Sequence, residues 1–364
     1  MQLKVKRAQS GLALITVLLI FAIVSVLAVA MIDRQASDIQ RSGTMLALQQ
    51  ARAYVTGAES AVKTGLYLDW ESNPDIDHAA EEWNQERMFP LSPGTAYISI
   101  KDAQGRFNLN WLSKGANNRE VQKVRFRNLL NELGLDVALA DLTARWMDEE
   151  SQEDDRYQSM EPPYRAAYRV CSHTSEMMLI EGFDAQTYRS LEGYIACLPV
   201  AAQLNVNTAS AVVLSALDDE LSLSSAQAIV AARGEEGFAD VGTFWSLPEV
   251  EPFTRRSANR GSNRDNNNDS NDNESGNNDE NDESAATGRW DETDFSVKSE
   301  YFESFIRVDL GDRIATAEVL IHRSPGSGKM NTLYRDYSRR EVRHESPVAG
   351  SNTDPALNDG SGLN

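Results

Sequence analysis

The stretch LALITVLLIFAIVSVLAVAMI, residues 12–32, decides how the rest of the chain is placed. It contains no charged residue, and its only hydroxyl side chains, those of Thr16 and Ser25, can bond to carbonyls of their own helix. At about 1.5 Å per residue, a helix of this length spans roughly 30 Å, the thickness of one hydrocarbon core. The stretch therefore predicts a transmembrane helix.

The flanking charges predict its orientation. Lys4, Lys6 and Arg7 precede the apolar stretch without any acidic residue, which indicates a cytoplasmic N-terminus. A secretory signal peptide is the alternative, but its apolar segment is about 7–15 residues long and ends at a cleavage site. Here the Ala28-x-Ala30 pattern lies inside the longer apolar run. We therefore expect a single-pass anchor, with the bulk of the chain across the membrane.

Composition limits the function further. The chain has 364 residues, 55 acidic against 35 basic, and a formal net charge of −20. This balance argues against a nucleic-acid binder, which needs a basic surface to displace counterions from phosphates. Two cysteines exclude a four-cysteine zinc site. The length allows two or three compact units.

The junction between the leader and the apolar run is distinctive. The basic leader ends in Ser10 and Gly11, and the apolar run follows at once. This arrangement resembles the class III signal of type IV pilins and type II secretion pseudopilins. The resemblance implies that a prepilin peptidase cuts between Gly11 and Leu12 and methylates the new N-terminal Leu12. Most members carry a glutamate as the fifth mature residue, where this chain has Thr16, so a contact between neighbouring subunits is missing.

Several later blocks resemble one family within that group, the general secretion pathway K proteins, which are minor pseudopilins of the type II secretion system. The blocks are FNLNWL at 107–112, WMD at 146–148, LP at 198–199, LNVNTA at 204–209 and SVKSEYF at 296–302. The resemblance implies a non-enzymatic subunit at the tip of the periplasmic pseudopilus, which starts assembly and limits filament growth during export of folded proteins. The implied partners are other minor pseudopilins, the major pseudopilin, the prepilin peptidase, the inner-membrane assembly platform and secreted proteins.

The same resemblance implies an α+β fold. A pilin-like long N-terminal helix packs on a small antiparallel sheet, and a large all-helical (SAM-like) domain is inserted. We expect these divisions: 1–11, cleaved leader; 12–32, transmembrane part of the helix; 33–66, its periplasmic part; 67–115 plus 290–345, pilin-type α/β domain; 116–250, inserted helical domain; 251–289, disordered Asn/Asp-rich segment; 346–364, disordered tail.

Residue patterns give the local expectations. Between Asp33 and about Leu66 there is no proline and the apolar residues recur at helical spacing, which predicts one helix from Leu12 to Leu66. Two helices broken at Ser42 and Gly43 are the alternative. Segment 67–94 is rich in proline and predicts a loop with one short helix near residues 79–87.

Two segments alternate apolar and polar residues. Residues 95–110 alternate around a turn at 103–105 and predict a hairpin, and residues 295–323 alternate around a turn at 311–312. We expect both sets to join in one antiparallel sheet on the upper half of the long helix. Between them, helices are predicted at 121–135, 137–148, 174–183 and 185–198, with two more within 204–233, the first capped by Asn207 or Thr208.

An acidic stretch, residues 148–161, is the candidate metal site. It holds seven carboxylates and one arginine, and hard cations such as calcium take six to eight oxygen ligands. It is not an EF-hand, because Asp155 stands where the glycine is required. A solvated acidic loop is the alternative, but the K family binds calcium in this region, so we expect a structural Ca²⁺. The candidate ligands are Asp148, Glu150, Asp154, Asp155 and Glu161.

Cys171 and Cys197 lie in the exported part of the chain, where oxidation is permitted. We expect a disulfide, with two buried thiols as the alternative. A bridge would contribute about 3.5 kcal/mol on the chain-entropy account.

Two other functions stay open. Residues 203–249 resemble helix-hairpin-helix modules, which would suit a type IV minor pilin that captures DNA. The hairpin at 218–224 has three carboxylates and no glycine, so it would repel phosphate. A tethered metal-dependent hydrolase would need histidines near an open metal position. The histidines, at 78, 173, 322 and 344, are scattered, and no HExxH, GxSxG or P-loop pattern occurs.

Overall fold

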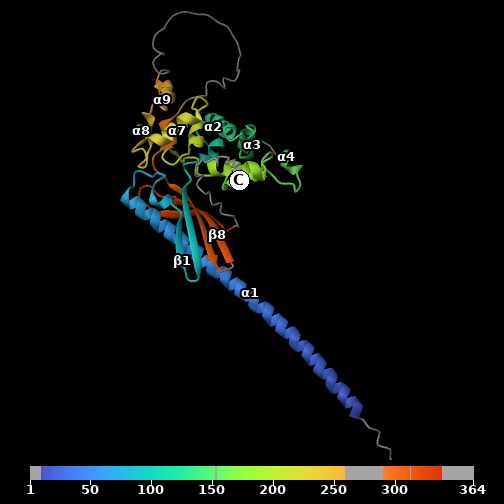
Figure 1. The fold of residues 1–364 in the computed structure, drawn as a ribbon. Coiled ribbons are helices and arrows are strands. Elements are labelled where there is room, and N and C mark those ends of the chain that lie inside the picture. The colour runs from blue at the N-terminus through green and yellow to red at the C-terminus, as the bar shows by residue number, and fades with distance from the viewer. Residues whose placement is uncertain (1–9, 152–153, 259–289, 312, 338–364) are drawn as a thin grey trace, which may run out of the picture.

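A computed structural model describes residues 10–151, 154–258, 290–311 and 313–337. Its first element is one straight helix, α1 (Ser10–Ser72), whose free end projects far from the rest of the molecule (Figure 1). Gly43 does not interrupt it, so the prediction of one continuous helix is confirmed and the broken alternative is wrong. The helix runs past Leu66 because Trp70 is held at its end: the Trp70 indole donates to the carbonyl of Pro325 at 3.2 Å.

The upper half of α1 packs on a sheet of five antiparallel strands with the order β1-β2-β7-β8-β9. The strands are β1 (Arg87–Leu91), β2 (Gly94–Asp102), β7 (Tyr301–Leu310), β8 (Arg313–Arg323) and β9 (Met330–Asp336). The helix buries a stripe spaced by three and four residues, Ala51, Val55, Ala58, Val62 and Leu66. This stripe meets Ile98, Phe302, Ile306, Val319 and Ile321 of the sheet.

The pairing of β2 with β7 confirms that the two alternating segments join in one sheet. Thr95 lies opposite Asp309, and Asp102 lies opposite Phe302. The backbone N–H of Ala103 donates to the carbonyl of Tyr301 at 3.0 Å, so the chain leaves the sheet and returns to it at adjacent points. The residues between these points are therefore an insertion in this sheet.

The predicted hairpin at 95–110 is wrong. β2 pairs with β1 and not with residues 107–108. The loop predicted for segment 67–94 from its prolines is therefore wrong at its C-terminal end, where residues 87–91 form β1. Pro90 is tolerated because β1 is an edge strand, where one side needs no donor. The short helix expected near 79–87 is only a 3₁₀ turn, η1 (Glu82–Asn84). Phe107 leaves the sheet because it stacks on Phe126 in the helical domain, at 5.2 Å between ring centroids.

The insertion is helical, and its elements cluster at the end of the sheet away from the free end of α1 (Figure 1). The α-helices are α2 (Arg119–Glu132), α3 (Leu139–Trp146), α4 (Asp154–Gln158), α5 (Ala185–Leu191), α6 (Ala211–Ser215), α7 (Leu223–Ala232), α8 (Val241–Trp245) and α9 (Glu251–Ala258). The 3₁₀ turns are η2 (Leu109–Leu112), η3 (Thr174–Leu179), η4 (Glu192–Tyr194) and η6 (Glu292–Asp294). Two short parallel pairs complete it: β3 (Phe107–Asn108) with β4 (Ile195–Ala196), and β5 (Leu204–Asn205) with β6 (Phe295–Ser296).

The helical domain has one core, which begins at Phe107 and ends at Val297. It therefore takes in residues on both sides of the expected range 116–250, including Trp111 and Trp290. Where a helix was expected at 174–183, the structure has only the 3₁₀ turn η3. The cap of α6 is Ser210, whose hydroxyl accepts from Val213 N at 3.3 Å, and not Asn207 or Thr208. Asn207 is instead fully buried.

Some expectations lie outside the described residues. These are the structure of the leader before Ser10, of the Asn/Asp-rich segment beyond Ala258, and of the tail beyond Tyr337, together with Asp312 in the expected turn.

Candidate functional site

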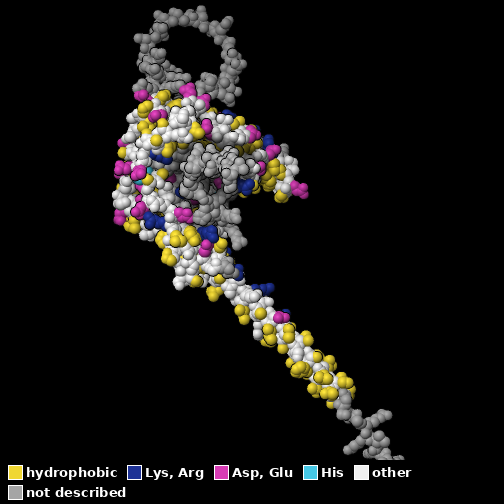
Figure 2. All heavy atoms as spheres, viewed as in Figure 1, with side chains coloured by type: hydrophobic (Ala, Val, Ile, Leu, Met, Phe, Trp, Pro, Cys, Tyr) yellow, Lys and Arg dark blue, Asp and Glu magenta, His cyan; other side chains and the backbone are white. Residues whose placement is uncertain are grey.

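The apolar part of α1 packs against nothing in the described chain. The side chains of residues 12–32 are exposed throughout, and hydrophobic atoms cover the free end of the helix (Figure 2). A helix whose most apolar window has a mean hydropathy of 3.1 is long enough to cross a membrane. Contact of these apolar side chains with water is unfavourable, so this end of the helix is suited to a lipid or protein environment.

The predicted processing residues lie at the start of this helix. Gly11 and Leu12 are its second and third residues, and the Leu12 side chain is exposed. The Thr16 hydroxyl donates to the carbonyls of Leu12 and Ala13, at 3.2 and 2.9 Å. The hydrogen-bonding capacity of the Thr16 hydroxyl is therefore used within its own helix, and it needs no partner from a neighbouring subunit.

The block FNLNWL forms a buried polar junction inside the helical domain. The Asn108 side chain accepts from Leu198 N at 3.0 Å and donates to the Pro199 carbonyl at 3.0 Å. The Asn110 amide donates to the carbonyls of Cys171 and Leu198, and its oxygen accepts from Cys171 N at 2.7 Å. The side chains of Asn108 and Asn110 thus satisfy buried backbone N–H and C=O groups that pair with no neighbouring strand.

The block LNVNTA forms a second junction, between the helical domain and the sheet. The Asn205 amide donates to the Asp77 carbonyl, to Asp102 and to Ser299 Oγ, at 3.1, 3.1 and 2.7 Å. The Asn207 side chain bonds to both backbone groups of Phe238. The sequence pointed to these asparagines only through a resemblance, because their partners are far away along the chain.

The two cysteines are joined. Cys171 and Cys197 form a disulfide with their Cα atoms 5.6 Å apart, and Asn110 holds the backbone on both sides of it. The bridge ties the segment before η3 to the residue that follows β4.

The acidic loop is only partly described. The Asp148 carboxylate accepts from Arg119 Nη2 at 3.2 Å and from Glu150 N at 3.0 Å, and the latter bond lowers its pKa. Lys114 Nζ lies 2.5 Å from Glu150 and 3.8 Å from Asp148, so one cation already bridges these two carboxylates. Asp154 and Asp155 lie in α4, with side chains outside the described part, and Glu161 is exposed.

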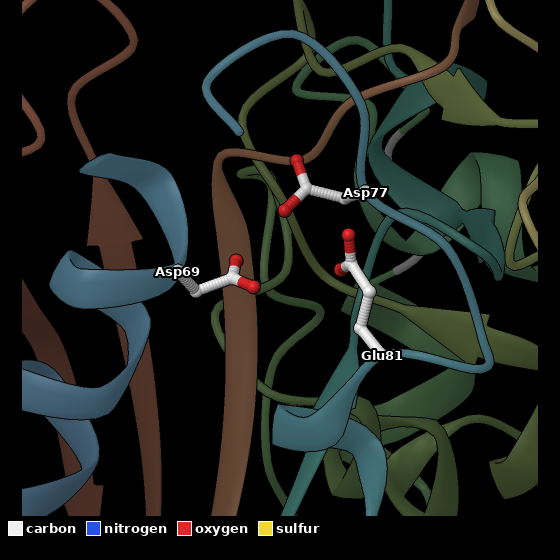
Figure 3. Close-up of side chains that lie close together, drawn as sticks. All are labelled: Asp69, Asp77 and Glu81. Atoms are coloured by element: carbon white, nitrogen blue, oxygen red, sulfur yellow. The ribbon is translucent and has the colours of Figure 1, made fainter. Parts of the chain in front are cut away.

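Within the described residues, the carboxylates that gather within reach of one ion are elsewhere. Oxygens of Asp69, Asp77 and Glu81 lie within 4.8 Å of one another, and Figure 3 shows the three side chains converging from the end of α1 and the segment that follows it. Arg323 donates to both carboxylate oxygens of Asp77 and, at 3.3 Å, to Asp69. No pattern in the sequence points to this cluster, because the three carboxylates come together only where α1 ends.

The remaining candidates lie apart. Asp218, in the loop between α6 and α7, accepts from Glu220 N at 3.1 Å, so its carboxylate is used to hold the turn. His173 contacts Glu318 at 3.0 Å, and His322 lies 3.5 Å from Glu300. His78 lies 3.6 Å from Glu81. The structure does not bring these three histidines together, and His344 lies outside the described residues.

A long helix, apolar at one end and packed on an antiparallel sheet at the other, defines a membrane-anchored subunit of the pilin type. The inserted helical domain distinguishes this subunit within the class. Sequence comparison agrees: two family profiles, both described as "Type II secretion system (T2SS), protein K", match this chain, one over residues 105–200 and the other over residues 204–260.

Full-length relatives extend this match. The type II secretion system protein K of Pseudomonas aeruginosa is 31% identical over 353 residues, covering 91% of this chain and 93% of the relative. The Klebsiella pneumoniae protein K is 35% identical over 263 residues, covering 67% of this chain and 81% of the relative. The chain belongs to the type II secretion system protein K family and is a minor pseudopilin component of that secretion machinery.

A solved structure supports the fold. A chain in the crystal structure of the GspK-GspI-GspJ complex from the type 2 secretion system of enterotoxigenic Escherichia coli aligns with a TM-score of 0.66 at 24% identity. The alignment covers 82% of this chain and 100% of that one. The long helix, the sheet and the inserted helical domain thus form one recurrent architecture.

Proposed function

We propose that this subunit stands at the tip of the pseudopilus, where it starts assembly and stops further growth. The observation that carries the proposal is the place of the insertion. It leaves the sheet after Asp102 and returns at Tyr301, and it covers the end of the head that faces away from the membrane helix (Figure 1). A further subunit placed at that end of the head would clash with the inserted helical domain.

The Thr16 position supports the same placement. A carboxylate there would be costly in lipid unless it were paired, and this chain has a hydroxyl satisfied by its own helix. The subunit therefore lacks a contact that would join it to a neighbour inside the shaft, which suits a terminal position.

The steric proposal is tested by removing the insertion. Ala103 N and Tyr301 O are already hydrogen bonded at 3.0 Å, so a two-residue Asn-Gly turn can join the strands when residues 104–300 are deleted. Labelled protein is expected along the shaft instead of only at filament tips. A matched control places an unrelated helical domain of similar size at the same junction, and tip-only labelling should return. Tip-only labelling of the deletion variant would refute the steric cause.

The partners follow from the same placement. The similar structure is named as a complex of GspK with GspI and GspJ. We propose that this chain assembles with the corresponding minor pseudopilins of its own system, then with the major pseudopilin on the assembly platform, and that secreted proteins contact the tip. Co-purification of the full chain with those two subunits tests the first step, with the insertion deletion variant showing which part they bind.

We also propose that a prepilin peptidase removes residues 1–11 on the cytoplasmic side and methylates Leu12, with the head in the periplasm of a single-pass inner-membrane protein. The basic leader and the uncharged run support this orientation. Mass spectrometry of the mature N-terminus should find N-methyl-Leu12. A product that begins beyond Ala30 would instead show ordinary signal-peptide cleavage and would refute the anchor.

For the acidic loop we propose a structural calcium ion. The pairing of Lys114 with both Asp148 and Glu150 supports it, because a cation is already drawn between these carboxylates. Lys114 is half exposed and can leave, while Asp154, Asp155 and Glu161 are close in sequence as further oxygen ligands. The proposed role of the whole chain is structural, so it requires no catalytic group.

Calcium binding is tested by thermal unfolding of the full chain with calcium and with excess chelator. The melting temperature should fall on chelation in the wild-type protein. It should change little in the variant D148N/E150Q, which keeps the shape of both side chains without their charge. An unchanged wild-type melt would refute the site.

A further inference from the structure

Residues 73–86 form a strap that carries the chain from the end of α1 to β1. It is anchored by Trp83, which is 6% exposed and packs edge-on against Phe302, with 5.2 Å between ring centroids. The strap closes one end of a cavity of about 690 Å³ between α1 and the sheet. Asp77, which is also buried, holds the first half of the strap through its hydrogen bonds. Beyond Asp77, Trp83 is the buried hydrophobic residue of the strap, so its packing on Phe302 decides whether that second half is closed.

Beneath the strap, negative charge exceeds positive charge. Asp69, Asp77 and Glu81 lie within 4.8 Å of one another, as Figure 3 shows, and the guanidinium of Arg323 is bonded to the two aspartates. Glu81 accepts from the Trp83 indole, so the residue that anchors the strap also belongs to the cluster. One full positive charge cannot neutralise three carboxylates in a desolvated space.

The other charged groups around the strap do not correct this balance. His78 Nε2 is 3.6 Å from Glu81 and comes from the strap itself. Arg87 of β1 is bonded to the exposed Glu82 at 2.9 Å, and Lys298, before β7, lies 3.9 Å from Asp75. Both of these cations are paired outside the cluster. Lys101 of β2 also faces the strap, and its ammonium donates to the side-chain oxygen of Asn84 at 3.3 Å.

We propose that the strap is a pH-sensitive latch, closed while Asp69 and Glu81 hold protons and released when both carboxyls ionise. Once ionised, the carboxylates of Asp69 and Glu81 repel each other, and Glu81 moves toward water. Trp83, whose indole is bonded to Glu81, then leaves its contact with Phe302. The cavity between α1 and the sheet then opens at this end.

The direction of the titration fits this geometry. Burial, together with the neighbouring carboxylates, raises the pKa of Asp69 to about 7. Burial also raises the pKa of Glu81 to about 7, against the opposing effect of the indole bond. Because both values lie above those of exposed carboxyls, the closed strap holds extra protons, and its stability falls as pH rises from about 4 to about 7.

The latch also reaches the helical domain. Asp77 N donates to the carbonyl of Val297 at 2.9 Å, and the Asn205 amide donates to the carbonyl of Asp77 at 3.1 Å. Release of the strap therefore loosens the junction that fixes the inserted domain to the end of α1. Near neutral pH, a small change in proton concentration would alter how rigidly the head is held.

The test uses the full chain in detergent micelles, labelled with 5-fluorotryptophan and kept in chelator so that the proposed calcium site does not contribute. Six tryptophans give six fluorine resonances, and the variant W83F identifies that of Trp83. Between pH 5.5 and 8.5 the Trp83 resonance should shift with a midpoint near 7. The resonance of Trp290, buried in the separate helical core, serves as the internal reference.

Variants separate the latch from other causes. D69N and E81Q imitate the protonated carboxyls, so each should shrink the Trp83 shift at least twofold and leave the resonance at its acidic position. E82Q changes the neighbouring exposed carboxylate and should titrate like wild type. A Trp83 resonance constant across this range, or an unchanged titration in both neutral variants, would overturn the latch. So would recovery of the acidic resonance position at pH 8 on addition of magnesium or calcium without chelator, because the cluster would then be a metal site.

Discussion

The side-chain amide of Asn205 lies 3.1 Å from a carboxylate oxygen of Asp102, and both residues are buried where the helical insertion meets the sheet. The same oxygen accepts from Ser299 Oγ and Thr208 Oγ1, each at 2.5 Å. Four segments that are distant along the chain are therefore joined by one carboxylate and one amide, since Asn205 also holds the backbone of Asp77. The inserted domain is not a loosely tethered module.

The first prediction concerns this junction. N205A leaves the buried carbonyl of Asp77 without its side-chain donor and removes one of the three donors to the Asp102 oxygen. An unsatisfied buried group costs about 1–3 kcal/mol. We expect the free energy of unfolding of the full chain to fall by about 3 kcal/mol, measured by urea unfolding in detergent. N128A is the matched control, because the Asn128 amide makes one longer bond, 3.4 Å, to Ala216. Equal losses in both variants would argue against a special role for the junction.

The second prediction concerns Glu59, which ties α1 to β9. Its carboxylate is bonded to Arg335 Nε at 2.5 Å, to Thr332 at 2.6 Å and to Lys63 at 2.8 Å. Burial alone would raise its pKa, but the bonds from Arg335, Lys63 and Thr332 outweigh that effect and lower the pKa to about 2. The charged form thus stabilises the fold above pH 4.5, and this contribution is lost as pH falls through about 2.

E59Q should therefore lower the free energy of unfolding at pH 7 by about 2 kcal/mol, the typical worth of hydrogen bonds to a charged group. The gap between wild type and variant should narrow as pH falls from 4.5 toward 2, measured by urea unfolding at each pH. E120Q, at an exposed glutamate paired with Lys123, is the control and should lie within about 0.5 kcal/mol of wild type. A gap that is constant with pH would mean that packing, not charge, is lost.

How far the sequence predicts this fold depends on how local each signal is. The long helix and the strands β7 and β8 follow from periodicities of a few residues, and the pairing of β2 with β7 follows from their matching alternation. The insertion was expected because helical patterns separate those two strands. Each of these features is predicted by a pattern among residues that are close together along the chain.

The remaining features depend on contacts between distant residues. β1 was missed because Pro90 is acceptable only at a sheet edge, which the sequence does not reveal. The cluster of Asp69, Asp77 and Glu81 exists only because α1 continues to Ser72 before the strap turns back. The acidic loop, by contrast, was conspicuous in sequence, yet its described carboxylates Asp148 and Glu150 are paired with basic side chains.

The third prediction concerns the bond between Cys171 and Cys197. The double variant C171S/C197S should lose about 3.5 kcal/mol of unfolding free energy, because the unfolded chain regains a closed loop. Reductant should destabilise wild type by a similar amount and leave the double variant unchanged. Intact mass after alkylation without reductant should show no added groups on protein isolated from cells. Two added groups would show that the bridge is absent in the cell.

The last prediction tests the hairpin that the sequence did not reveal. Gly94 follows Ser92 and Pro93 in the turn between β1 and β2. Its φ is +118°, a backbone angle that residues other than glycine rarely adopt. A Cβ there would lie 2.0 Å from the backbone oxygen of Asp309 on the neighbouring strand, and backbone cannot move aside cheaply. G94A should therefore cost about 3 kcal/mol or more of unfolding free energy, from the strained dihedral and the clash together. Gly115 is exposed with no atom near its missing Cβ, so G115A should stay within about 0.5 kcal/mol of wild type. If G94A were as stable as G115A, β2 would not turn back on β1 at this point, and the outer edge of the sheet would have to be redrawn.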